Sequence, residues 1–258
     1  MGSATYLYCV VHASNAPVLR RVSGGVPGAG RLTVHAAGRS LWIVVAAVPL
    51  DVYGEDALEH GLRDLKWVAK VAMAHEHIVE QCARHRHSTV VPMKLFTMFS
   101  TDDRAVEATR SRARQIIALV KRIAGCEEWG VRITRRPRPV ERTTLRIARP
   151  ASGAAFLAAR KQARDSTRDA VRAAAESALA AYEALAAIAR DVRRRHDVPD
   201  GAAAPPLLDA AFLVPAPRRS QFKSTAKRLA AGGVAAGMDL TLSGPWPAYN
   251  FVQPEPRP

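Results

Sequence analysis

Apolar residues in the first part of the chain recur at every second position or in short unbroken runs. Residues 6–11 are rich in β-prone side chains, and residues 32–36 alternate apolar and polar positions, as a half-buried strand does. Residues 41–48 form a longer apolar run that predicts a more buried strand. Because a short Gly-Arg turn separates the last two segments, we expect them to pair as a hairpin.

Helical spacing then replaces this pattern. Apolar side chains three or four positions apart predict one helix over about 55–86, with acidic residues in its first turn, where the helix dipole favours them. A second amphipathic helix is predicted between a cap at Ser100 or Thr101 and a stop at Gly125.

Strands predicted over 89–98 and 129–133 complete this first set of elements. The mixture of sheet and helix in one contiguous stretch indicates a compact α+β domain, residues 1–134. Arginines and prolines dominate residues 135–150, which are predicted to be a basic connector.

The second half is predicted to be a further α+β domain, residues 135–258. Helical spacing indicates a long helix over about 152–195, and an apolar seam with a seven-residue period runs along its second half. The seam consists of Val171, Ala178, Leu185 and Val192. A strand, a helix and a strand follow, over 207–214, 219–231 and 238–242. The predicted fold is therefore α+β with two domains.

Composition supports a folded chain without a membrane span. Of the 258 residues, 48% are hydrophobic, which fits a packed core. The longest apolar stretch, 41–50, falls well short of the roughly 20 residues of a membrane helix, and no secretory signal precedes the first strand. Cys9, Cys82 and Cys126 are widely spaced in apolar surroundings, so we expect reduced core thiols and a cytoplasmic protein.

The formal net charge of +15 leaves two interpretations open. Such a charge favours polyanionic partners, yet it also arises from a solvated basic surface. A nucleic-acid-binding protein is the alternative function, suggested by arginines over 132–149 and by a later basic group: Arg218, Arg219, Lys223, Lys227 and Arg228. The lack of an aromatic stacking platform, of helix-turn-helix spacing and of zinc-ligand spacing argues against it.

No catalytic, cofactor or metal site is predicted. The glycines of residues 25–30 lead into a strand and lack the lysine of a phosphate-binding loop. His75, His77, His85 and His87 point in different directions on a helix, so the sequence argues against metal binding. His75 is expected to lie at the edge of the core, where a hydrogen bond satisfies its ring. Glu127 and Glu128 diverge on a strand and do not form a carboxylate pair.

Short motifs are distributed along nearly the whole chain: residues 49–54, 65–68, 75–79, 90–99, 128–131 and 242–251. In their sequences and their order, these motifs resemble the GvpF/GvpL family of gas vesicle proteins. Phe96 departs from the family, in which many members have glycine at this position of a Phe-Gly-Thr motif. Glycine tolerates a backbone conformation that phenylalanine adopts less readily.

The resemblance implies an accessory or minor structural protein that assists nucleation or assembly of the gas vesicle shell. It implies a second domain similar to a ferredoxin-like fold, binding to the major shell protein or to other gas vesicle proteins, and a location at the gas vesicle in the cytoplasm. It implies no enzyme activity, no cofactor and no small-molecule substrate.

The C-terminal aromatic segment is the candidate interaction site, with two interpretations. Prolines stiffen the backbone and would present the aromatic side chains with little entropy to lose. Alternatively, the same side chains pack internally and tie the C-terminal segment to a domain. The residues are Pro245, Trp246, Pro247, Tyr249 and Phe251. Trp67 and Trp129 are expected in the core.

Overall fold

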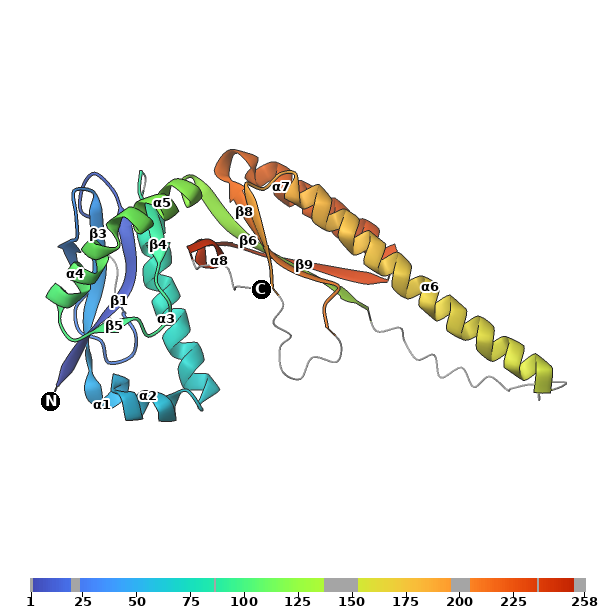
Figure 1. The fold of residues 1–258 in the computed structure, drawn as a ribbon, viewed down its shortest axis with the longest axis horizontal. Helices are drawn as coiled ribbons and strands as arrows, with labels where there is room; N and C mark the ends of the chain where they lie inside the picture. Colours follow the sequence, from blue (N-terminus) through green and yellow to red (C-terminus); the bar gives the residue numbers. More distant parts are fainter. Residues whose placement is uncertain are drawn as a thin grey trace. The chain divides into compact units, whose positions relative to one another are not determined.

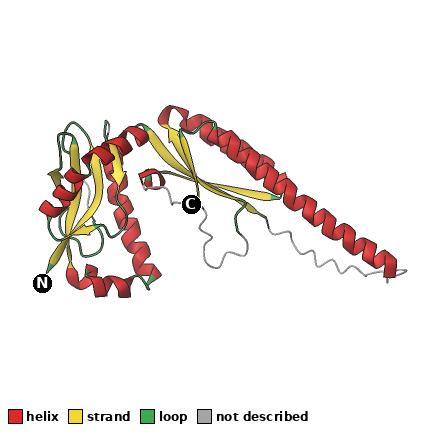
Figure 2. Cartoon of the chain, viewed as in Figure 1, coloured by secondary structure: helices red, strands yellow, loops and turns green. Residues whose placement is uncertain are grey.

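The computed structural model describes residues 2–19, 24–85, 87–136, 153–195, 205–235 and 237–252. These residues form helices packed against two antiparallel sheets, and the fold is α+β (Figure 1; Figure 2). Contacts divide the chain into two compact units. One comprises Met1–Glu128 together with the C-terminal segment that begins at Pro245, and the other comprises Trp129–Gly244.

The first sheet has the strand order β2-β3-β1-β4, with the short β5 also paired to β1. Its strands are β1 (Ser3–His12), β2 (Thr33–Ala36), β3 (Leu41–Pro49), β4 (Thr89–Pro92) and β5 (Met98–Phe99). The expected hairpin of β2 and β3 is present, with Thr33 opposite Val45. A register shift between Leu7 and Cys9 marks a bulge in β1.

Helices cover both faces of this sheet. They are α1 (Leu50–Tyr53), α2 (Glu55–Gly61), α3 (Leu65–Ala83), α4 (Asp102–Ser111) and α5 (Ala113–Ile123). Tyr6 of β1 faces α3, where its hydroxyl meets His75. Thr5 points the other way and donates a hydrogen bond to Asp102 at the start of α4. Because β1 is covered twice, its residues from Tyr6 to Val11 are all buried.

Two predicted helices are each broken in the structure. The helix predicted over 55–86 divides into α2 and α3, and Asp64 caps α3 by accepting the N–H of Lys66. The second divides into α4 and α5 at Arg112. There the hydroxyls of Thr109 and Ser111 bond to backbone carbonyls one turn back, which competes with regular helix geometry.

The strand predicted over 89–98 is likewise interrupted. Only its ends are strands, β4 and β5, and a turn between them is closed by the N–H of Thr97 donating to the carbonyl of Lys94. Phe96 lies within this turn at φ 60°, a left-handed conformation that ends extended structure.

The second sheet has the strand order β7-β8-β6-β9. Its strands are β6 (Cys126–Arg135), β7 (Asp191–Arg194), β8 (Leu208–Pro215) and β9 (Met238–Trp246). Along the chain they alternate with α6 (Gly153–Ala186), the short 3-10 helix η1 (Ala216–Arg218) and α7 (Arg219–Ala235), and α8 (Tyr249–Val252) follows β9. The order along the second unit is therefore strand, helix, strand, strand, helix, strand.

The helix predicted over 152–195 is too long at its C-terminal end. The structure ends α6 at Ala186 and forms β7 from Asp191. The N–H of Arg190 donates to the carbonyl of Leu213, and β7 pairs with β8. Pairing with a buried strand thus overrides a local sequence that contains no helix breaker. Residue 152, the predicted start of this helix, and residues 137–150 of the predicted connector lie outside the described residues.

The core of the second unit lies between its sheet and the helices α6 and α7. Ala174, Ala178, Ala181 and Leu185 of α6 are buried there, together with Phe212 of β8 and Phe222 of α7. The predicted seam is therefore a packing face from Ala174 onward. Val171 is exposed, and α6 continues beyond the sheet at its N-terminal end (Figure 1).

The two units differ in extent from the predicted domains 1–134 and 135–258. The described residues 245–252 group with the first unit because α8 contacts β4 and α5. The chain thus leaves the first unit near Glu128 and returns to it at Pro245.

Candidate functional site

The C-terminal aromatic segment divides into an exposed part and a buried part. Trp246, at the end of β9, is 38% exposed, and Pro245 beside it is exposed as well. After Pro247, whose carbonyl accepts the N–H of Tyr249, the short α8 turns inward. Phe251 is fully buried, and Tyr249 packs against the core of the first unit. Tyr249 and Phe251 thus pack internally, whereas Trp246 remains available at the surface.

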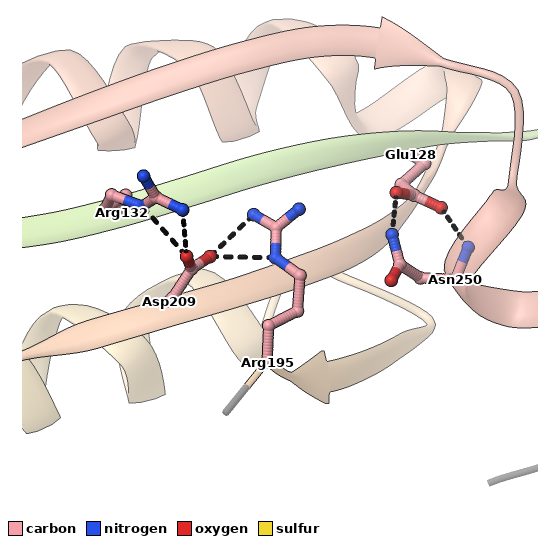
Figure 3. A network of polar contacts seen from close by, with 5 residues as sticks. All are labelled: Glu128, Arg132, Arg195, Asp209 and Asn250. Carbon is pink, nitrogen blue, oxygen red and sulfur yellow. Dashed lines mark hydrogen bonds and ion pairs between the residues drawn. The ribbon is translucent and has the colours of Figure 1, made fainter. Parts of the chain in front are cut away.

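A buried carboxylate holds this segment in place. Asn250 donates its backbone N–H to one oxygen of Glu128 at 2.9 Å, and its side-chain amide donates to the other (Figure 3). Glu128 is 3% exposed, so these bonds satisfy a group that is expensive to leave unpaired. Two of the segments that carry the family resemblance, 128–131 and 242–251, therefore meet in space through Glu128 and Asn250.

A second buried carboxylate lies in the other unit. Asp209 of β8 accepts two hydrogen bonds from the guanidinium of Arg132 at 2.6 and 2.8 Å, and Arg195 bonds its second oxygen at 2.7 and 2.8 Å (Figure 3). Each arginine engages one carboxylate oxygen through two nitrogens, so charge-assisted hydrogen bonds satisfy both oxygens of Asp209. The Asp209 side chain is 2% exposed.

Gly130 makes room for this network. A Cβ atom there would lie 2.6 Å from the Ser243 hydroxyl and 3.1 Å from a guanidinium nitrogen of Arg195. Sequence reasoning missed Asp209, although a single carboxylate within the apolar run 207–214 was a usable signal: a buried acid needs a charged partner. The network anchors the sheet face opposite the helices.

Several of the cations that suggested nucleic-acid binding have partners within the chain. Arg132 binds Asp209, Arg136 pairs with Asp239, and Arg218 donates to the carbonyl of Ile188. Lys223 lies 5.8 Å from the centre of the Trp129 ring. Trp129 itself is buried, and Trp67 packs against the core of the first unit, as expected from the sequence.

His75 lies in a buried cluster of tyrosines. Its Nδ1 is 3.0 Å from the Tyr6 hydroxyl, and the rings of Tyr6, Tyr8 and Tyr249 surround it. Burial lowers the pKa of His75 to about 4, partly offset by the backbone of Met93. Its Nε2 is buried without a hydrogen-bond partner among the described residues. The imidazole is therefore neutral at physiological pH and acts in packing.

The other potential metal ligands and the cysteines do not form a site with His75. Within the described parts of the chain, no group of three or more His, Cys, Asp or Glu side chains is placed to hold a metal ion. Cys9 and Cys82 are buried and face each other as free thiols, and Cys126 is partly buried. The hydrogen bond with Cys82, together with burial, raises the pKa of the Cys9 thiol, so it stays protonated.

Phe96 accommodates its position by stacking. Its φ of 60° is unfavourable for a side chain with a Cβ, but its ring stacks on Trp67 with a centroid separation of 5.7 Å and an interplanar angle of 9°. Its backbone N–H also donates to the Tyr6 hydroxyl at 3.2 Å. The stack and this hydrogen bond therefore hold Phe96 in a left-handed backbone conformation.

Comparison with known proteins places this architecture in one class. A family model described as gas vesicle synthesis protein GvpL/GvpF matches residues 4–253. The chain belongs to this family. It is 30% identical over 254 residues to gas vesicle protein L of Streptomyces sp. (strain CB03234), covering 96% of this chain and 92% of that protein.

Solved structures have the same fold. GvpF from Anabaena sp. PCC7120 superposes with a TM-score of 0.68 at 14% identity, covering 98% of both chains. GvpF from Microcystis aeruginosa gives 0.66 at 13% identity, covering 97% of this chain and 99% of that one. Among the described residues, no helix is both long and apolar enough to cross a membrane.

Proposed function

We propose that this chain is a non-catalytic accessory or minor structural protein of gas vesicles, which assists nucleation or assembly of the shell in the cytoplasm. The family match over residues 4–253 is the observation that carries the proposal. The partners are the major shell protein or other gas vesicle proteins.

In this proposal the second unit is a ferredoxin-like domain. Its element order and the strand order β7-β8-β6-β9 support this assignment. The two helices that connect strands, α6 and α7, also pack together on one face of an antiparallel sheet, as in that fold. Such a domain presents free sheet edges, and an added strand from another protein can pair with an edge. The proposed role is to shield β-prone segments of shell subunits before they polymerise.

Three buried polar groups have structural partners within the fold. Glu128, Asp209 and His75 are each held within the fold, by Asn250, by two arginines and by the tyrosine cluster respectively. These contacts account for the three groups as parts of the packed units, so the proposal assigns them no catalytic role.

Co-purification tests the proposal directly. The affinity-tagged chain is expressed with the major shell protein and recovered under gentle conditions, and retention of the shell protein is the expected result. Trp246→Ala removes the exposed aromatic side chain, and Gln115→Ala on the exposed face of α5 serves as the control. If wild type and control both recover no shell protein and no other gas vesicle protein, the proposal is wrong.

A further inference from the structure

A groove of about 630 Å³ runs beside β9 in the second unit. One wall is α7, and the floor consists of apolar side chains: Ala226, Ala230, Leu240 and Leu242. Leu240 and Leu242 are half-buried, so the apolar floor remains open to solvent. A pocket with this lining favours a partner that brings apolar side chains.

The strand that borders the groove is an edge strand. β9 ends the order β7-β8-β6-β9, with β6 as its neighbour in the sheet. Edge strands are usually protected by charges, prolines or bulges. The part of β9 along the groove, residues 240–243, reads Leu-Thr-Leu-Ser and contains no charged residue or proline. Its outer backbone groups can therefore pair with another extended segment.

The opposite rim is cationic. Arg219, Lys223 and Lys227 are spaced four residues apart on α7, so they lie on one face of the helix. Lys223 and Lys227 are exposed. No carboxylate is among the described residues that line the groove. The rim therefore attracts acidic groups, and its charge acts most strongly on a segment already placed along β9.

We infer that this groove binds an extended, β-prone and acidic segment of another protein as an added strand on β9. Because α7 covers the face of the sheet that carries Leu240 and Leu242, the side chains of the segment on this one face make both contacts. Apolar side chains there contact Leu240 and Leu242, and carboxylates there face Lys223 and Lys227. This inference rests on the proposed function, because it assigns a surface and a partner chemistry to the shielding of shell components. The apolar floor favours such a segment over nucleic acid, whose backbone needs no apolar contact.

A binding assay with synthetic peptides tests the inference on the full chain. The probe is a short peptide in which every second residue is in turn valine and glutamate, with threonine between them, so that both lie on one face of the strand. It is titrated at fixed ionic strength. We expect measurable binding, weakened about tenfold or more by the double variant Lys223→Glu, Lys227→Glu. The control is Arg164→Glu, Arg168→Glu on the exposed part of α6, which changes net charge equally and is expected to leave affinity unchanged.

Two further probes separate strand pairing from general charge attraction. A peptide of the same sequence with every backbone amide N-methylated has no N–H to donate at either edge, so it cannot extend a sheet and is expected to bind at least about tenfold more weakly. The unmethylated probe with lysine in place of glutamate is expected to prefer the Lys223→Glu, Lys227→Glu variant over wild type. The inference is wrong if both double variants lose peptide affinity equally, or if the methylated peptide binds as tightly as the unmethylated one. It is also wrong if Lys223→Glu, Lys227→Glu leaves peptide affinity unchanged and duplex DNA displaces the peptide.

Failure of this inference is distinguishable from failure of the proposed function. If the peptide does not bind but the chain still recovers the shell protein in co-purification, the groove assignment is wrong and the accessory role stands. If the chain recovers no gas vesicle protein and vesicles form normally without it, the accessory role is wrong, whether or not the peptide binds.

Discussion

Asn250 binds both carboxylate oxygens of Glu128, a residue 122 positions earlier in the chain. This contact holds α8 against the first unit, so that Phe251 and Tyr249 reach the core. The C-terminal segment is thus a structural part of the N-terminal unit, while Trp246 remains partly exposed at its start.

Replacing Asn250 with alanine is expected to destabilise the first unit. Its side-chain amide no longer satisfies the buried Glu128 carboxylate, which costs about 1–3 kcal/mol of unfolding free energy. Urea denaturation measures the change. Gln115→Ala removes an exposed amide from α5 and is expected to stay within about 0.5 kcal/mol of wild type. Equal stability of the two variants would show that the Asn250 contact contributes nothing.

Two aspartates on the same sheet give a matched comparison. Asp209→Asn removes the buried charge that holds Arg132 and Arg195, with an expected loss of about 2–3 kcal/mol in unfolding free energy. Asp239→Asn affects only an exposed pair with Arg136, where the expected loss is at most about 1 kcal/mol. Chemical denaturation of both variants checks the order, and a larger effect at Asp239 would contradict it.

His75 predicts a dependence of stability on pH. Its folded-state pKa, about 4, lies below the ordinary value of 6.5, so the unfolded state binds a proton first as pH falls. Stability is therefore full above about pH 6.5 and decreases by about 3 kcal/mol towards pH 4. His75→Gln is expected to flatten this slope between pH 6.5 and 4, whereas His77→Gln, at an exposed position, is expected to preserve it. Unfolding midpoints across this range provide the measurement, and parallel slopes for wild type and His75→Gln would refute the assignment.

Two substitutions of Phe96 distinguish the cost of its backbone strain from the contribution of its ring stacking. Both Phe96→Ala and Phe96→Gly lose the stack on Trp67 and are expected to be less stable than wild type. Only glycine relieves the left-handed backbone at φ 60°, so Phe96→Gly is expected to be more stable than Phe96→Ala by about 1 kcal/mol. Thermal denaturation of the pair suffices, and a more stable alanine variant would contradict this reading of the turn.

Local pattern was sufficient to predict most elements, because strands and helices leave their periods in the sequence. The failures occurred where distant partners decide the structure. Residues 191–194 have no intrinsic reason to leave a helix, and they do so because β8 offers a pairing edge. The turn at Phe96 depends on Trp67 and Tyr6, which lie far away in the chain.

The polar contacts were hidden for the same reason. Nothing near Glu128 in the sequence indicates that Asn250 is its partner, since spacing carries no information over such a separation. The heptad seam of α6 was recognised, but its exposed start at Val171 was not, because burial depends on where the sheet ends. The groove beside β9 likewise requires the strand order, which periodicity does not give.

Deletion of the gene in its native host, followed by flotation of the cells, tests the central claim most directly. The account predicts that the deletion strain loses buoyant gas vesicles and that expression of the wild-type chain restores them. Normal flotation and normal vesicles without the chain would contradict a role in shell assembly.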